Sequence, residues 1–271
     1  MAKNQPTQKQ LPIVQRVRIR YTKRGPLRFA SHRDLARAFE RAILRAGVPI
    51  AYSQGFSPHP KLSYASAAPT GTSSECEFLE LALHTETDLA QLRSALDAAL
   101  PAGVDVLAAV PAGPASLAEL IEACHWRMEL PGIDPGQLGA AVVAFLALPE
   151  VLVERTMSQG RRTVDVRAAV LRLVLVSDLS GGSNGRDGQP VTAPCGDSAP
   201  PCAILDLVVR QVTPTVRPDD VLAGLRAVAV LELSAPLRAT RLAQGLLTED
   251  CGIIDPLTTD RGTAAIGAAA R

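Results

Sequence analysis

Two histidines in the first quarter of the chain, His32 and His59, are the side chains best suited to proton transfer near neutral pH. Arg28 and Lys61 stand close to them in sequence and could hold a phosphate group beside them. A histidine pair around a phosphate or ribose can act as general acid and base. His32 and His59 are therefore the candidate catalytic residues. The alternative is that both imidazoles bond to backbone carbonyls and hold a loop.

The sequence around His32 predicts the start of a helix. Ser31 has the character of an N-cap, and Asp34, three residues later, is its capping-box partner. The helix should run to about Ala46 and stop at Gly47. His32 would then lie in the first turn, where unpaired N–H groups and the positive end of the dipole favour anions.

Arginine recurs at every fourth position of this predicted helix. A spacing of four drifts by about 40° per step around an α-helix, so the arginines follow one slowly turning face. They are Arg33, Arg37, Arg41 and Arg45. Arg33 and Arg37 lie beside the first turn and are predicted to join the site, whereas a solvated helix face suffices to explain the other two.

The segment GFSPHPK, residues 55–61, is the second predicted wall of the site. Two prolines bracket His59 and restrict the local backbone, and Gly55 permits a backbone angle forbidden to other residues. Phe56 could stack on a base or pack beneath the loop, and packing is the favoured reading. The candidate substrate-binding residues of this loop are Ser53, Gly55, Phe56, His59 and Lys61.

Alternation of polar and apolar residues from Ile13 to Tyr21 predicts a half-buried strand. Arg16, Arg18 and Arg20 would share its open face. Three like charges in a row repel one another, so an anionic ligand such as RNA would stabilise them. Two alternatives are a solvated face and a face that meets acidic residues of a second domain.

The charge distribution supports a basic binding surface. Residues 1–63 hold thirteen Lys and Arg against two acids, a formal charge of +11, while residues 64–271 carry −10. The net charge of +1 therefore conceals a strong asymmetry. Such a surface predicts a phosphate-bearing partner, with RNA as the expected one.

The order of predicted elements indicates the α+β class, with two tandem ferredoxin-like (βαββαβ) units. The first covers residues 13–115 and carries the basic face. The second covers residues 123–250, is interrupted by a low-complexity insertion at 178–202, and includes a long strand over Val164–Val176. Residues 1–12 and 251–271 are predicted tails.

Cysteine spacing predicts no metal or iron–sulfur site in this chain. Five cysteines are widely scattered, without a Cys-x2-Cys or Cys-x3-Cys-x2-Cys motif. Cys195 and Cys202 lie in the insertion and could pair or bind a metal. No apolar run is long enough for a membrane span, and the first residues lack a signal-peptide core. We therefore expect a soluble, cytoplasmic protein.

A Ser-His-x-Asp helix start followed by Gly-Phe-x-Pro-His-Pro-Lys is a specific combination. Over about residues 13–130 the chain resembles the radical-SAM-associated domain of unknown function, DUF2344. The matching positions are Arg28, Ser31, His32, Asp34, Arg37, Arg41, Arg45, Gly47, Ser53, Gly55, Phe56, Pro58, His59, Pro60 and Lys61. Residues 75–81 (ECEFLEL) resemble the acidic strand that follows in the family.

This resemblance implies a partner more than a reaction. Such domains are fused behind radical SAM modules in many bacteria and stand alone elsewhere, so a radical SAM protein is the expected partner in trans. The partner, and not this chain, would carry the iron–sulfur cluster and S-adenosylmethionine. The chain would bind tRNA or rRNA and present it to that enzyme. The alternatives are a stand-alone, metal-independent RNA-processing or RNA-modifying enzyme that uses His32 and His59, and a pure protein–protein adaptor.

Overall fold

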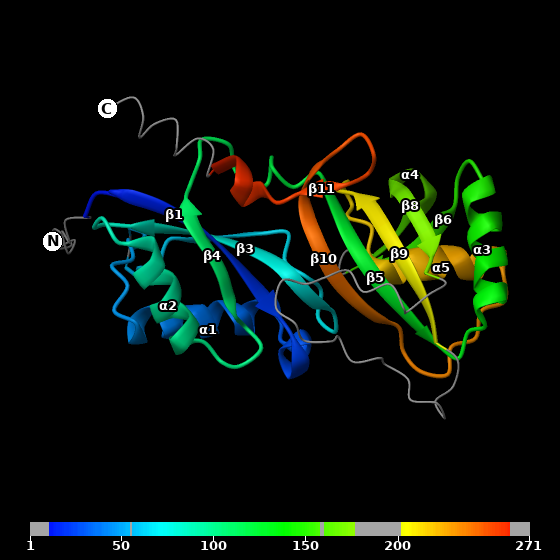
Figure 1. The fold of residues 1–271 in the computed structure, drawn as a ribbon, viewed down its shortest axis with the longest axis horizontal. Coiled ribbons are helices and arrows are strands. Elements are labelled where there is room, and N and C mark those ends of the chain that lie inside the picture. The colour runs from blue at the N-terminus through cyan, green and yellow to red at the C-terminus, as the bar shows by residue number, and fades with distance from the viewer. Residues whose placement is uncertain (1–10, 55, 158–159, 177–201, 261–271) are drawn as a thin grey trace, which may run out of the picture. The chain divides into compact units, whose positions relative to one another are not determined.

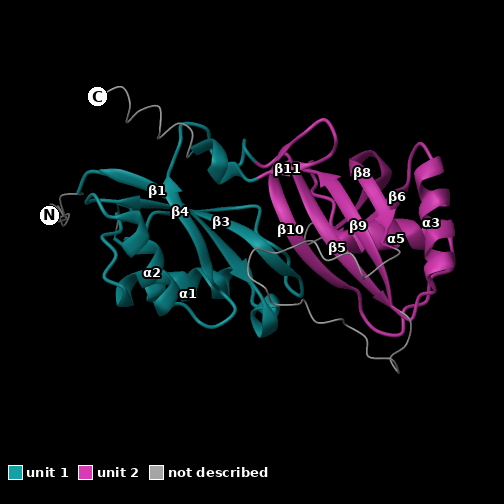
Figure 2. Cartoon of the chain, viewed as in Figure 1, with its two compact units in different colours: residues 1–120, 255–271 teal, residues 121–254 magenta. Residues whose placement is uncertain are grey.

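The computed structural model describes residues 11–54, 56–157, 160–176 and 202–260. The chain divides into two compact units (Figure 2): unit 1 contains the residues up to 120 and those from 255 onward, and unit 2 contains residues 121–254. Helices and antiparallel strands occur in both units, which confirms the predicted α+β class. Part of the predicted tail is ordered into the fold, because residues 253–254 form a strand and residues 256–260 are helical.

Unit 1 is built from a four-stranded antiparallel sheet and two α-helices (Figure 1). Its elements are β1 (Gln15–Lys23), the 3-10 helix η1 (Gly25–Phe29), α1 (His32–Arg45), β2 (Leu62–Ala65), β3 (Ser73–Leu83), α2 (Leu89–Ala99) and β4 (Val106–Pro111). The strand order is β4-β1-β3-β2. The short helix η1, which starts at Gly25-Pro26, is not among the predicted elements.

One face of the β1 strand builds the core of unit 1. Val17, Ile19 and Tyr21 are at most 1% exposed, as the alternation of the sequence predicts. They pack with Leu35 and Phe39 of α1 and with the apolar side chains of α2. This burial fixes β1 in register, so the intervening arginines must lie on the opposite face.

Unit 2 has its own antiparallel strands and its own core. Its elements are β5 (Ala123–Pro131), α3 (Pro135–Ala147), β6 (Leu152–Met157), β7 (Gly160–Asp165), α4 (Val166–Ala169), β8 (Val170–Leu175), β9 (Cys202–Arg210), α5 (Pro218–Val228), β10 (Arg238–Leu247) and β11 (Ile253–Ile254). The sheet order is β10-β5-β9-β8, with β11 on β10 and with β6 and β7 forming a separate hairpin. Trp126, Met128, Phe145 and Leu225 lie in the core between this sheet and the helices α3 and α5.

The predicted long strand over Val164–Val176 is wrong. The segment comprises the end of β7, the helical turn α4 and the strand β8. Asp165 causes the break, because its side chain accepts hydrogen bonds from the backbone N–H groups of Arg167 and Ala168 and caps α4. The apolar residues on either side of Asp165 predict a single strand, because their pattern does not reveal this cap.

Within the described residues, no helix combines the length and the apolar character needed to cross a membrane. The predicted insertion at 178–202 and the tail at 1–12 fall almost entirely outside the described residues.

Candidate functional site

The arginines of β1 are paired within unit 1. Arg18 is only 2% exposed, and its guanidinium bonds to Glu80 at 2.9 Å and to Asp260 at 2.9 Å. Arg16 bonds to the other oxygen of Glu80 at 3.0 Å. Arg20 bonds to Asp255 at 2.8 Å. The predicted open face is therefore wrong for Arg18, because carboxylates of this chain supply the neutralising charge.

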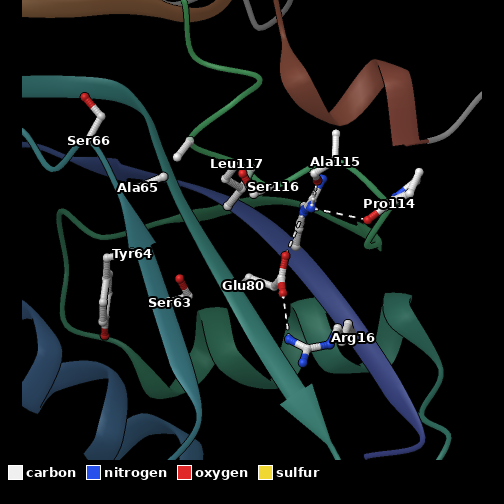
Figure 3. Close-up of a pocket in the computed structure, with 13 residues that line it drawn as sticks. Arg16, Ser63, Tyr64, Ala65, Ser66, Glu80, Pro114, Ala115, Ser116 and Leu117 are labelled. Carbon is white, nitrogen blue, oxygen red and sulfur yellow. Dashed lines mark hydrogen bonds and ion pairs between the residues drawn. The ribbon is translucent and has the colours of Figure 1, made fainter. Parts of the chain in front are cut away.

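A cavity of about 390 Å³ opens beside these arginines (Figure 3). Its walls come from β1, β2 and β3 and from residues 113–118. In Figure 3 Glu80 bonds to Arg16 across one wall, and Ser63 lies on another. Because Glu80 already offsets the charge of its arginine neighbours, the cavity offers polar contacts but little attraction for an anion.

Helix α1 begins as predicted. Ser31 is the N-cap, and its hydroxyl and the Asp34 carboxylate form the two bonds of a capping box. Hydrogen bonds from the Ser31 side chain and backbone hold the pKa of Asp34 below its usual value. The cap thus uses the one acid in the first turn for hydrogen bonds, while Arg37 and Arg33 act on the same carboxylate through their charges.

The predicted site residues Arg33 and Arg37 on α1 remain exposed, and so does Arg41. Arg33, Arg37 and Arg41 form no hydrogen bond or ion pair with any other residue in the described part of the chain. Arg45 differs, because it donates to the carbonyl oxygen of Ala99. The three unpaired arginines recur every four residues, so they share one side of a helix that presents its buried residues to the core.

The junction before α1 adds an aromatic group to this basic surface. The Arg28 guanidinium lies 4.6 Å from the centre of the Phe29 ring, a cation–π distance. The Phe29 side chain is 60% exposed. The Nε atom of Arg28 is buried and has no hydrogen-bond acceptor among the described residues. We name Arg28, Phe29, Arg33, Arg37 and Arg41 the α1 basic face.

His32 packs against an aromatic side chain of β2. Its ring centre is 4.9 Å from that of Tyr64, in an edge-to-face arrangement. The Tyr64 hydroxyl is buried without a partner among the described residues. Burial raises the pKa of Tyr64 far above its ordinary value, and the nearby charge of Glu40 adds to the shift. Tyr64 is therefore a neutral phenol that supports the imidazole of His32.

The loop before β2 is a narrow, hairpin-like excursion. Ser53 and His59 close it, with bonds from Ser53 N to His59 O at 2.8 Å and from His59 N to the Ser53 hydroxyl at 2.9 Å. Phe56 at its tip is 86% exposed, so the favoured reading that it packs beneath the loop is wrong. The Lys61 ammonium has no ion-pair partner among the described residues. Gly55 lies outside them.

His32 and His59 make different contacts in the structure. His32 packs against Tyr64, whereas the backbone of His59 bonds to Ser53 in the loop before β2. Four residues lie between His59 and Tyr64, and this stretch contains the bridge at Pro60 and the strand that begins at Leu62. The shared acid–base site of the two imidazoles stays a prediction.

Carboxylates are the site residues that sequence reasoning missed. Glu80 lies opposite Arg18 in the pairing of β1 with β3, so the strand register could have identified it. Asp260 is 242 residues away from Arg18 in sequence, and no local signal connects the two. Among the described residues, no group of three His, Cys, Asp or Glu side chains could hold a metal ion. Cys195 lies outside those residues.

One protein-family model matches most of this chain. The family model described as an uncharacterized protein conserved in bacteria (DUF2344) matches residues 16–218, more than half of the chain. The chain belongs to the DUF2344 family. The resemblance stated from the sequence motifs is thereby confirmed. Comparison with curated proteins gave no match.

The DUF2344 match runs from β1 to the first residue of α5. It includes the α1 basic face and the loop of Phe56. It ends before Asp255 and Asp260, the carboxylates that pair with Arg20 and Arg18. The description of the family names no reaction, so the chemistry must be argued from the surface itself.

Proposed function

We propose that this protein binds RNA along the α1 basic face and presents it to a partner enzyme. The observation that carries the proposal is the set of three exposed arginines, Arg33, Arg37 and Arg41, which form no hydrogen bond or ion pair among the described residues. Unpaired guanidinium groups on one helix face are suited to successive phosphates of a nucleic-acid backbone. The arginines of β1 contribute less, because this chain already neutralises them.

Two exposed aromatic rings stand on either side of α1 in the sequence. Phe29, which belongs to the α1 basic face, precedes the helix, and Phe56 follows it; both side chains are largely exposed. Aromatic rings beside basic residues are typical stacking partners of unpaired bases. Helix α1, with 14 residues, is about 21 Å long. Because the exposed rings can stack on unpaired bases, the surface favours single-stranded or looped RNA over a regular duplex.

We infer the partner from the resemblance seen in the sequence motifs. Domains of the DUF2344 type resemble those fused to radical SAM modules, so we infer a radical SAM enzyme in trans. The chain has no three-cysteine cluster motif, and we assign the iron–sulfur cluster and S-adenosylmethionine to that partner. The RNA would be a tRNA or rRNA, and the complex would be cytoplasmic.

We also infer that the two units are tandem ferredoxin-like domains. Support comes from their shared strand orders, β4-β1-β3-β2 in unit 1 and β10-β5-β9-β8 in unit 2. In each unit a connection that contains a helix leads from an inner strand to an outer strand, and neighbouring strands pair antiparallel. The open face of such a sheet is a frequent binding surface.

The adaptor alternative has one observation in its favour. Leu44 on α1 is 69% exposed and lies next to Arg41 and Arg45 in the helix. An apolar group within a basic surface also suits a protein partner. The enzyme alternative would use His32 and His59 as acid and base.

Ultraviolet crosslinking in native cells tests the proposal. The tagged protein would be purified, the bound RNA sequenced and the co-purified proteins identified. We expect RNA crosslinks in the peptides of α1 and of the Phe56 loop, together with a radical SAM protein. Protein partners in the absence of any RNA crosslink would favour the adaptor. Crosslinks confined to other peptides would remove the α1 basic face from the site.

A further inference from the structure

Three adjacent strands of unit 2 place charged side chains on the sheet face opposite the core. His125 of β5 bonds to Asp206 of β9, with Nε2 and Oδ2 2.6 Å apart. Arg172 of β8 donates to the other oxygen of Asp206, also at 2.6 Å. The neighbouring Trp126 points into the core, as the two-residue period of a strand requires. One carboxylate thus holds an imidazole and a guanidinium side by side.

This cluster is within reach of solvent. The side chains of His125 and Asp206 are 22% and 24% exposed, and that of Arg172 is 40% exposed. Burial alone would raise the pKa of Asp206, but its bonds with His125 and Arg172 outweigh this and lower it. Asp206 therefore stays ionised and orients both partners while their outer surfaces remain accessible.

A third cation faces the same cluster. Arg127 lies two residues beyond His125 on β5, and its backbone pairs with that of Asp206. Its side chain forms no hydrogen bond or ion pair with any residue in the described ranges. Glu129, two residues further along, does not compensate it, because Glu129 already bonds to Arg238 at 2.9 Å. Positive charge thus exceeds what Asp206 alone neutralises.

An unsatisfied donor points to a missing ligand. The Nε atom of Arg172 is buried and has no acceptor among the described residues. Buried donors are almost always satisfied, and one that lacks a protein acceptor is completed by water or by a bound group. A guanidinium next to an unpaired arginine is the usual arrangement for holding the oxygens of a phosphate.

We propose that this face of unit 2 is a phosphate-binding site, with Arg127 and Arg172 as its anion contacts and Asp206 as the residue that positions Arg172. His125 lies beside them, with Nε2 engaged by Asp206 and Nδ1 as its remaining nitrogen. The site lies on other strands than the α1 basic face, so it does not depend on the proposed RNA surface.

The groups that act on His125 are few. Asp206 faces it from β9, Arg172 from β8 and Arg127 from its own strand, while its backbone partner on β10 is the uncharged Ala243. Asp250, in the turn after β10, acts on Arg172 at longer range and is itself bonded to Thr248.

Sulfate is the first probe, because it has the shape and the oxygens of phosphate and a fixed double negative charge. Binding to the full chain would be followed through the ring resonances of His125. We expect Arg127→Gln to weaken sulfate binding about tenfold. The control Arg162→Gln, which removes an exposed charge from the β6–β7 hairpin of the same unit, should leave it unchanged. Fluorescence of Trp126, the one tryptophan of the chain, would verify that each variant is folded.

Competition with two further ligands distinguishes the source of the phosphate. Adenosine monophosphate tests a phosphomonoester, and an oligouridylate without terminal phosphates tests the RNA backbone. Whichever competes with sulfate and is weakened by Arg127→Gln identifies the ligand class. Equal sulfate binding by wild type and Arg127→Gln would overturn the proposal, whatever the α1 variants do.

Discussion

Arg18 and Asp260 lie 242 residues apart in sequence and form a buried ion pair, with two nitrogen–oxygen contacts of 3.0 and 2.9 Å. Their side chains are 2% and 4% exposed. Asp260 also accepts a bond from the backbone N–H of Gly113. This carboxylate therefore joins β1, the segment after β4 and the last described helical turn into one unit.

Removing the charge of Asp260 should destabilise unit 1. Asp260→Asn leaves the buried Arg18 guanidinium with only Glu80 as a charged partner, and breaking a buried pair costs about 3 kcal/mol. Urea unfolding followed by circular dichroism would measure the loss. The control is Glu154→Gln, which removes the exposed pair with Arg161 and should cost less than about 1 kcal/mol. Equal effects of the two variants would show that burial of the Arg18 pair is not important.

The hydroxyl of Tyr64 should be dispensable. It is buried without a partner among the described residues, so Tyr64→Phe should leave the free energy of unfolding unchanged or raise it by up to about 1 kcal/mol. Tyr64→Ala should cost about 3 kcal/mol or more, because the ring contacts Phe39 and His32. A marked loss of stability in Tyr64→Phe would reveal a bonded hydroxyl.

The stability of unit 2 should depend on the ionisation of Asp206. Its folded-state pKa is lowered, because bonds with His125 and Arg172 outweigh the effect of burial. The stabilisation is therefore complete above the unfolded pKa of about 3.9 and is lost as the pH falls through the lower folded value. The difference in unfolding free energy between wild type and Asp206→Asn should shrink below about pH 4. Trp126 fluorescence during urea unfolding would measure it, and a difference that stays constant in acid would contradict the assignment.

Phe56 should matter for binding and not for folding. Because its side chain is 86% exposed, Phe56→Ala should change the free energy of unfolding by less than about 0.5 kcal/mol. Loss of one stacked base should weaken RNA binding by about 1–3 kcal/mol. Val143→Ala, which alters an exposed apolar residue of α3, should change neither quantity. Unchanged RNA affinity in Phe56→Ala would remove the loop from the interface.

Local patterns in the sequence account for most of the elements. Alternation identified β1, and the Ser31–Asp34 capping box identified the start of α1. Asp165 caps a helical turn within an apolar segment, and the apolar pattern there wrongly predicts one continuous strand. The error shows that side-chain bonds to the backbone can override an apolar pattern.

The candidate site was harder to predict than the fold. The three arginines of β1 were correctly placed on one face, but their partners Asp255 and Asp260 come from the opposite end of the chain. Long-range pairing depends on tertiary packing, which no local spacing encodes. The arginines of α1 were predictable because their exposure follows directly from helical periodicity.

RNA affinity measured against salt concentration tests the central claim most directly. Each phosphate contact in single-stranded RNA contributes about 0.7 to the logarithmic salt slope, so Arg37→Gln/Arg41→Gln should reduce the slope by about 1.4 and weaken binding. The matched control, Arg161→Gln/Arg162→Gln, removes two exposed charges from β7 and should leave slope and affinity near those of wild type. If the α1 pair and the control pair bind RNA with the same slope as wild type, the α1 basic face is not the binding surface.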